Sequence, residues 1–239
     1  MPLLFVLLVI EPVKVIKLPV NCTLLATYGN ETFFTPFVGK GILKMDSSGI
    51  FETLLHTENE NYRIYDFAVT PFAFYLNDSK RIEKCYKKLG VKEIVYEGNN
   101  ISSFIVTPQD ELVVADIGNQ ELVFLNGDLI IKRKNILIID LDYSMEKIFA
   151  LTPGEIMVFD KYGNILEKIK IPERFEHITV YNQNIYLSSR TVDYIYKWDF
   201  HWVKIELGKK ISALIVNEKN LLIIDEYGSN LFVYNNPEH

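Results

Sequence analysis

The sequence has few cysteines, no tract typical of a linker and no excess of positive charge. Only two of its 239 residues are cysteine, Cys22 and Cys85, which excludes a framework of several disulfides. No segment is dominated by Gly and Ser, by Pro or by a single residue type, so we expect a folded chain throughout. The net charge is -6, and nucleic acid is therefore not an expected partner.

Long apolar runs are also missing. The first ten residues, MPLLFVLLVI, are apolar, but a bilayer-spanning helix needs about 20 such residues, and we expect no membrane-spanning segment. Residues 1–10 have two open interpretations, the remnant of an export signal that lacks its basic start or a buried strand. The first favours a periplasmic or secreted, extracytoplasmic protein, whereas the second leaves the cytoplasm possible.

What the sequence has instead is a rhythm of short strands. Runs of Ile, Val, Leu, Phe and Tyr alternate with turn residues, which is typical of an all-β chain. A bulky residue followed by a polar turn residue recurs in steps of 40, 40, 34, 39 and 36 residues. The polar members are Asp46, Tyr86, Asn126, Asp160, Asp199 and Asn235. Six units follow from this spacing.

A second marker supports the repeat. FAVTP at residues 67–71 and FIVTP at residues 104–108 stand 37 residues apart. Four strands can be distinguished within a unit, separated in the third one by the turns TPQD, IGN and NG. Four antiparallel strands in each of six repeats of about 40 residues predict a six-bladed β-propeller.

The two ends of the chain complete this prediction. The last unit has only three strands, and the segment PVKVIKLPV at residues 12–20 resembles NILEKIKIP at residues 164–172, the fourth strand of another unit. We therefore expect the N-terminal strand to pair with the C-terminal blade and close the propeller. The prediction is a single domain, 1–239, whose blades lie approximately at 20–60, 61–99, 100–135, 136–174, 175–210 and 211–239 plus 12–19.

Two local features have alternatives. Residues 78–90 fit a third strand by their place in the repeat, but they also fit an amphipathic helix with a cap at Asp78 or Ser79. The strand is favoured. Cys22 begins a first strand and Cys85 lies in a third strand of the next blade, which is too far for a disulfide. Both are predicted to be free thiols.

Several turns carry a family resemblance. VADIGNQELVF at residues 114–124 resembles the NHL-repeat turn between second and third strands, IIDEYGSNLFVY at 223–234 is a looser version, and FDKYGNILEKI at 159–169 is similar to the next turn of that class. The chain thus resembles the six-bladed NHL-repeat and TolB-like propellers. The resemblance implies a fold and says little about activity.

Ligand sites of propellers usually form around the channel mouth, at the rim that carries the loops between second and third strands and the connections into each first strand. Polar residues in these segments are the candidates for ligand binding, and each has a structural explanation such as turn capping. They are Arg63, Asp116, Asn119, His177, Arg190 and Asp225.

The sequence lacks a nucleophile elbow, a Cys-x-x-Cys pair and a phosphate-binding loop, so we expect no catalytic residue and no cofactor. The predicted function is a binding or scaffolding module that contacts a protein partner through its rim loops, with a small-molecule ligand as a further possibility. The alternative is a metal-dependent hydrolase or lactonase, because lactonases of this fold class bind one divalent cation, Ca²⁺ or a similar ion, through carboxylate and amide oxygens. Its candidate ligands are Asn99, Asn119, Glu176 and Asp225.

Overall fold

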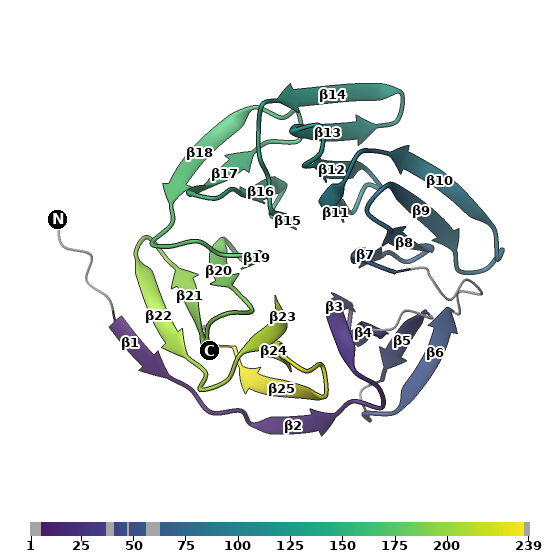
Figure 1. Cartoon of the computed structure of the whole chain (residues 1–239). Helices are drawn as coiled ribbons and strands as arrows, with labels where there is room; N and C mark the ends of the chain where they lie inside the picture. The colour runs from purple at the N-terminus through teal and green to yellow at the C-terminus, as the bar shows by residue number, and fades with distance from the viewer. Residues whose placement is uncertain (1–5, 37–40, 47, 56–62, 237–239) are drawn as a thin grey trace. The chain divides into compact units, whose positions relative to one another are not determined.

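The protein consists of β-strands joined by short turns (Figure 1). The computed structural model describes residues 6–36, 41–46, 48–55 and 63–236, and these contain 25 strands and no helix. The strands form six sheets, which are the six four-stranded antiparallel blades of a β-propeller, and one blade carries an additional parallel strand. The predicted fold class is therefore confirmed. The described part of the chain has no helix that could cross a membrane.

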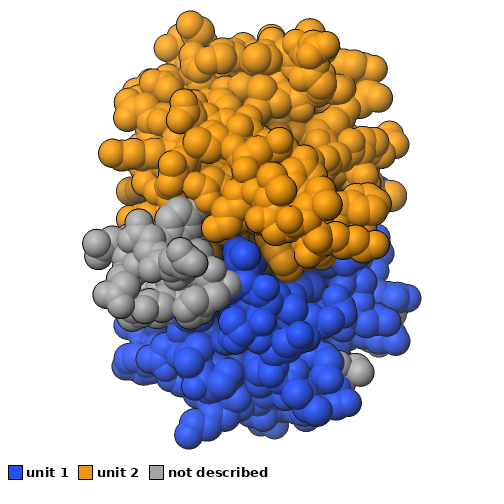
Figure 2. All heavy atoms as spheres, turned by 90° about the vertical axis from the view of Figure 1, so that its right-hand side faces the viewer, with its two compact units in different colours: residues 1–61, 175–239 blue, residues 62–174 orange. Residues whose placement is uncertain are grey.

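The chain divides into two compact units, which Figure 2 shows in different colours. Unit 1 comprises residues 1–61 and 175–239, and unit 2 comprises residues 62–174. Unit 2 contains blades 2, 3 and 4, each with its strands in chain order. Their bounds are β7 (Asp66–Val69), β8 (Ala73–Asn77), β9 (Arg81–Tyr86) and β10 (Lys92–Glu97) in blade 2; β11 (Ile101–Val106), β12 (Leu112–Asp116), β13 (Glu121–Asn126) and β14 (Leu129–Lys134) in blade 3; β15 (Asp140–Ser144), β16 (Lys147–Leu151), β17 (Glu155–Phe159) and β18 (Ile165–Lys170) in blade 4.

Unit 1 contains blades 1, 5 and 6 together with the N-terminal strands. Their bounds are β3 (Cys22–Tyr28), β4 (Glu31–Pro36), β5 (Ile42–Met45) and β6 (Phe51–Leu55) in blade 1; β19 (His177–Tyr181), β20 (Asn184–Ser188), β21 (Tyr194–Trp198) and β22 (Trp202–Glu206) in blade 5; β23 (Ile211–Val216), β24 (Asn220–Asp225), β25 (Asn230–Asn235) and β2 (Lys14–Lys17) in blade 6. A further strand, β1 (Val6–Val9), joins blade 5.

Within each unit, neighbouring blades share their hydrophobic cores because the inner strands are buried on both faces. Every residue of β8 and β12 is buried, whereas the fourth strands β10, β14 and β18 are mostly exposed. In unit 2, one apolar cluster joins blades 2 and 3 through Tyr75 and Val114, and another joins blades 3 and 4 through Phe124 and Phe159. A single blade could not bury both faces of its sheet alone, so the blades stabilise one another.

The N-terminal segment completes blade 6, as the sequence predicts. Strand β2 pairs antiparallel with β25, from Lys14 opposite Val233 to Lys17 opposite Asn230. Leu18, just after this strand, is buried in the apolar cluster that blades 6 and 1 share, and Ile16 packs against it. The strand occupies 14–17 of the predicted segment 12–19.

Strand β1 corrects one of the two interpretations of residues 1–10, of which 1–5 lie outside the described residues: it is not a buried strand, and the export-signal remnant stays a prediction. Strand β1 pairs parallel with β22, the outer strand of blade 5, so this blade has one strand more than predicted. Leu8 and Val9 are 40% and 68% exposed, and the strand is not the buried one expected. The physical reason is its place at the sheet edge, which offers backbone hydrogen bonds but no covering layer.

The two other local predictions are confirmed. Within residues 78–90, which could have formed either a strand or a helix, residues 81–86 form strand β9. Pairing with β8 and β10 outweighs the local helix propensity. Cys22 and Cys85 are free and buried, and burial raises the pKa of both thiols, that of Cys22 to about 12.

Candidate functional site

Asp116 and Asn119, two predicted ligand-binding residues, form one hydrogen-bonded turn in unit 2. Asp116 is 1% exposed at the end of β12. Its carboxylate accepts hydrogen bonds from the Asn119 side-chain amide at 2.8 Å, from the Asn119 backbone N–H at 3.1 Å and from the Asn99 backbone N–H at 2.9 Å. The Tyr96 hydroxyl donates a fourth, at 3.3 Å. These bonds join the loop after β12 to the connection that enters β11.

Asp225 occupies the matching turn of blade 6, in unit 1. Its carboxylate accepts hydrogen bonds from the Ser229 backbone N–H at 2.7 Å, and from the side-chain amide and backbone N–H of Asn230 at 2.8 and 3.2 Å. The Asp-Asn pairing is therefore the same in two of the turns that resemble NHL repeats. In both, the carboxylate organises its own turn.

The remaining predicted residues also lie at the ends of strands. In unit 1, Glu176 and the partly buried His177 are neighbours, and the Glu176 carboxylate accepts a hydrogen bond from the Arg190 backbone N–H at 3.0 Å. Burial opposes the charge of Glu176, but this bond and the nearby His177 lower its pKa below the usual value. In unit 2, the exposed Arg63 guanidinium lies 5.0 Å from the centre of the Tyr65 ring. Among the described residues, no three His, Cys, Asp or Glu side chains gather as they do around a metal ion.

A polar row along the first strands of unit 2 was missed by the sequence interpretation. Asp66 in β7 accepts hydrogen bonds from the Ser103 hydroxyl at 3.1 Å and from the Phe104 backbone N–H at 3.0 Å, both in β11. The Ser103 oxygen in turn accepts one from the Leu141 backbone N–H of β15 at 3.3 Å. The signal was present, since Asp66 and Ser103 directly precede FAVTP and FIVTP and share their spacing of 37 residues. The row links three blades through polar side chains.

The free energy of unfolding should decrease as the pH rises, because the folded protein holds the proton of Asp66 more tightly than the unfolded chain does. Burial, and secondarily the charge of Asp140, raise the pKa of Asp66 to about 7, whereas an unfolded chain titrates near 3.9. The folded state then binds more protons than the unfolded state between about pH 4 and 7, so the free energy of unfolding decreases across that window. We expect the loss across the whole window to be about 4 kcal/mol, at 1.36 kcal/mol for each pKa unit.

Urea denaturation from pH 4 to 8 measures this effect. Asp66→Asn should remove the decrease, and Asp140→Asn should move it to lower pH because it deletes a neighbouring negative charge. Asp128→Asn, at an exposed turn position, is the matched control and should follow the wild type. An unchanged pH profile in Asp66→Asn would contradict the assignment.

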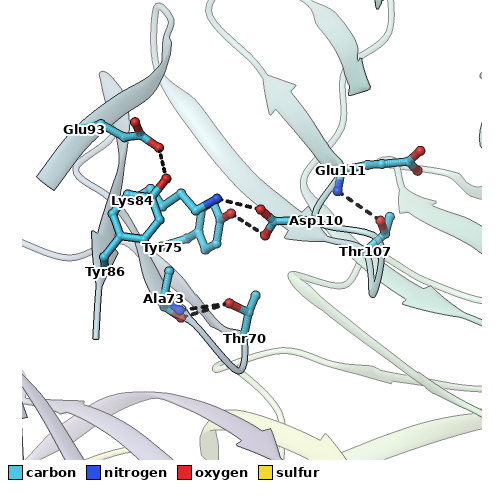
Figure 3. Close-up of polar contacts among 9 residues, drawn as sticks. All are labelled: Thr70, Ala73, Tyr75, Lys84, Tyr86, Glu93, Thr107, Asp110 and Glu111. Atoms are coloured by element: carbon cyan, nitrogen blue, oxygen red, sulfur yellow. Dashed lines mark hydrogen bonds and ion pairs between the residues drawn. The ribbon is translucent and has the colours of Figure 1, made fainter. Parts of the chain in front are cut away.

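A second polar cluster joins blades 2 and 3 (Figure 3). Asp110, in the turn between β11 and β12, accepts hydrogen bonds from the Tyr75 hydroxyl and the Lys84 ammonium, each at 2.6 Å. Burial disfavours both charges, but the mutual hydrogen bonds raise the pKa of Lys84 and lower that of Asp110. Burial also raises the pKa of Tyr75 to about 12. All three side chains bind one another at neutral pH, which indicates a structural bridge between the blades.

The large apolar side chains exposed in turns lie mostly at the other end of the blades from the predicted site. In an antiparallel blade, the turn between strands one and two and the turn between strands three and four share one end, here called the hairpin end. Phe200, Phe72 and Leu89 of these turns are 92%, 76% and 72% exposed, and the other members are Tyr28, Ile50, Val91, Met145 and Tyr162. The opposite end has Val20, Tyr65, Leu137 and Tyr227. Sequence alone could not separate these exposed residues from the many buried Phe and Tyr.

Comparison with known proteins shows the fold and no closer relationship. No protein-family model and no curated protein matches the sequence. Among solved structures, virginiamycin B lyase from Staphylococcus aureus is similar over 93% of this chain and 99% of its own, with a TM-score of 0.66 and 10% identity. An auxiliary nutrient binding protein from Bacteroides thetaiotaomicron is similar over 90% of this chain and 69% of its own, with a TM-score of 0.69 and 9% identity. The Pan2 WD40 domain from Neurospora crassa is similar over 95% of each chain, with a TM-score of 0.65 and 10% identity.

Proposed function

We propose that this β-propeller is a non-catalytic binding module whose ligand is a protein, contacted through exposed side chains at the hairpin end of its blades. The observation that carries the proposal is the exposure of Phe72 and Leu89 in the turns of unit 2 and, separately, of Phe200 in a turn of unit 1. Exposed aromatic side chains contribute nothing to a core, but they are the residues that most often anchor a protein interface.

Backbone conformation at two of these turns supports the same interpretation. Phe200 and Met145 have φ values of +56° and +49°, in the left-handed region that favours Gly and Asn. Met145 and Glu146, with φ +62°, both occupy this region in the β15–β16 hairpin, where Asn-Gly would be the favoured pair. Folding gains nothing from a large, 92% exposed aromatic ring at position 200. A role outside the fold explains why such side chains stand there.

The solved structures of the same fold include a lyase, a nutrient binding protein and a WD40 domain, so the fold alone does not select a function. No contact among the described residues favours the lactonase alternative. The Asn119 amide and the Asp225 carboxylate hold their own turns, and the Glu176 carboxylate accepts a hydrogen bond from the loop after β20. Two expectations from the sequence remain predictions: that the protein functions outside the cytoplasm, and that it needs no bound cation.

Cross-linking in the source cells tests the proposed function. The full-length chain and a variant with Phe72→Ser, Met145→Ser and Phe200→Ser are expressed at equal levels, cross-linked and purified, and their protein adducts are compared by mass spectrometry. We expect at least one partner that the wild type enriches tenfold or more over this variant. A variant with Val20→Ser and Leu137→Ser, exposed positions at the opposite end of the blades, is the matched control and should retain the partner. Identical adducts for all three chains would contradict the proposal.

A further inference from the structure

The two hairpins of blade 2 combine exposed apolar side chains with lysines. The turn between β7 and β8 presents Phe72, and the turn between β9 and β10 presents Leu89 and Val91, which are 76%, 72% and 54% exposed. The exposed lysines of the second turn lie beside them. We call this set the blade 2 hairpin surface; its members are Phe72, Lys87, Lys88, Leu89, Val91 and Lys92.

Backbone hydrogen bonds hold the two turns together. The Lys87 N–H donates to the Phe72 carbonyl at 2.9 Å, and the Lys87 ammonium donates to the Thr70 carbonyl at 2.6 Å. Within the second turn, the Tyr86 N–H donates to the Val91 carbonyl at 3.0 Å, and Gly90 takes a left-handed φ of +63°. Ala73, the first residue of β8, pairs with Tyr86, the last residue of β9, and its N–H donates to the Thr70 hydroxyl of the first turn (Figure 3). The surface is therefore preorganised, which lowers the entropy lost on binding.

The charge of this surface is opposite to that of the whole chain. Lys87, Lys88 and Lys92 contribute three positive charges, while the chain has a net charge of -6. Lys84, on the adjoining strand, is neutralised by Asp110. The neighbouring carboxylate, Glu93, accepts a hydrogen bond from the Tyr86 hydroxyl at 2.6 Å and adds one negative charge. Electrostatic complementarity thus favours an anionic partner at this site.

We infer that the blade 2 hairpin surface binds an acidic protein segment that also carries bulky apolar side chains. This deepens, and rests on, the proposed protein-binding function. Phe72 and Leu89 would pack against the apolar side chains of the segment, and Lys88 and Lys92 would pair with its carboxylates. A lipid surface fits less well, since recognition of anionic lipid generally uses clusters of four to eight basic residues and the net negative charge of the protein would be repelled.

Fluorescence anisotropy with the full-length chain tests this inference. The probe is a labelled 14-residue peptide of Asp and Glu with Phe or Leu at every third or fourth position. We expect saturable binding that weakens at least tenfold in Lys88→Glu/Lys92→Glu, at least fivefold in Phe72→Ser, and several-fold when salt rises from 50 to 300 mM. Lys210→Glu/Tyr227→Ser, a like change at exposed positions on the opposite end of blade 6, is the matched control and should bind like the wild type.

Three outcomes would overturn the inference. The first is that the acidic peptide does not bind at millimolar protein. The second is that a peptide with Gln in place of every Asp and Glu binds equally well. The third is that the protein binds phosphatidylserine-containing vesicles more tightly than the peptide. Circular dichroism verifies that each variant is folded. Failure here is distinguishable from failure of the proposed function, because a partner that cross-links to the wild type and to Lys88→Glu/Lys92→Glu, but not to the Phe72/Met145/Phe200 variant, would leave that function standing.

Discussion

Deleting residues 1–19 should abolish the cooperative unfolding transition of the protein. Strand β2 supplies the fourth strand of blade 6. On either side of it, the Val13 N–H donates a hydrogen bond to the Val233 carbonyl at 2.8 Å, and the Leu18 N–H donates one to the Ser229 carbonyl at 2.9 Å. Without this strand, the edge of β25 is unpaired, and Leu18 and Ile16 leave the cluster shared by blades 6 and 1. Each such apolar loss costs about 2–5 kcal/mol, which together approaches the total stability of about 5–15 kcal/mol of a typical protein.

Thermal and urea denaturation followed by circular dichroism measure this effect. The matched control is deletion of residues 1–9, which removes β1 with its exposed Leu8 and Val9 but retains Ile10 and β2. This shorter deletion should lower the midpoint by only a few degrees. If the chain lacking residues 1–19 unfolds as cooperatively as the shorter deletion and at a similar temperature, the N-terminal strand does not stabilise blade 6.

Gly118→Ala should destabilise the protein by at least about 3 kcal/mol, beyond the range of most single substitutions. A Cβ at Gly118 would overlap the backbone carbonyl oxygen of Asn99, and backbone cannot move aside as a flexible side chain can. The turn would have to separate from the connection into β11, with loss of the bonds from Asn99 N–H and Asn119 to the buried Asp116. An unsatisfied buried carboxylate adds its own penalty.

Gly154→Ala is the matched control, because this glycine occupies the corresponding loop of blade 4 and a Cβ there meets nothing within 4 Å. It should be neutral or slightly stabilising, since alanine reduces the entropy of the unfolded chain. The midpoints of urea denaturation of both variants are compared at one pH. Equal stability of the two variants would show that the two loops of blade 3 do not pack as closely as the contacts at Gly118 indicate.

The position of the candidate site shows where interpretation of the sequence reached its limit. The predicted rim residues Asp116 and Asp225 each hold a turn, and recognising the turn pattern was sufficient to place them. The exposed ring of Phe72 follows a buried strand pattern in the sequence, FAVTPFAFYL, in which Phe67 and Phe74 are buried. Composition cannot distinguish the three, because exposure depends on which residues the turn projects outward.

The strand order, the six blades and the completion of the last blade by residues near the N-terminus could all be predicted from the residues alone. These follow from the alternation of apolar residues and from turn residues, which act over a few positions of the chain. The contacts of Asp66 with Ser103 and of Lys84 with Asp110 could not be predicted in this way, because they depend on how neighbouring sheets pack. The same holds for the one surface that Phe72, Leu89 and the nearby lysines form, since two turns from different hairpins had to be joined by a backbone hydrogen bond.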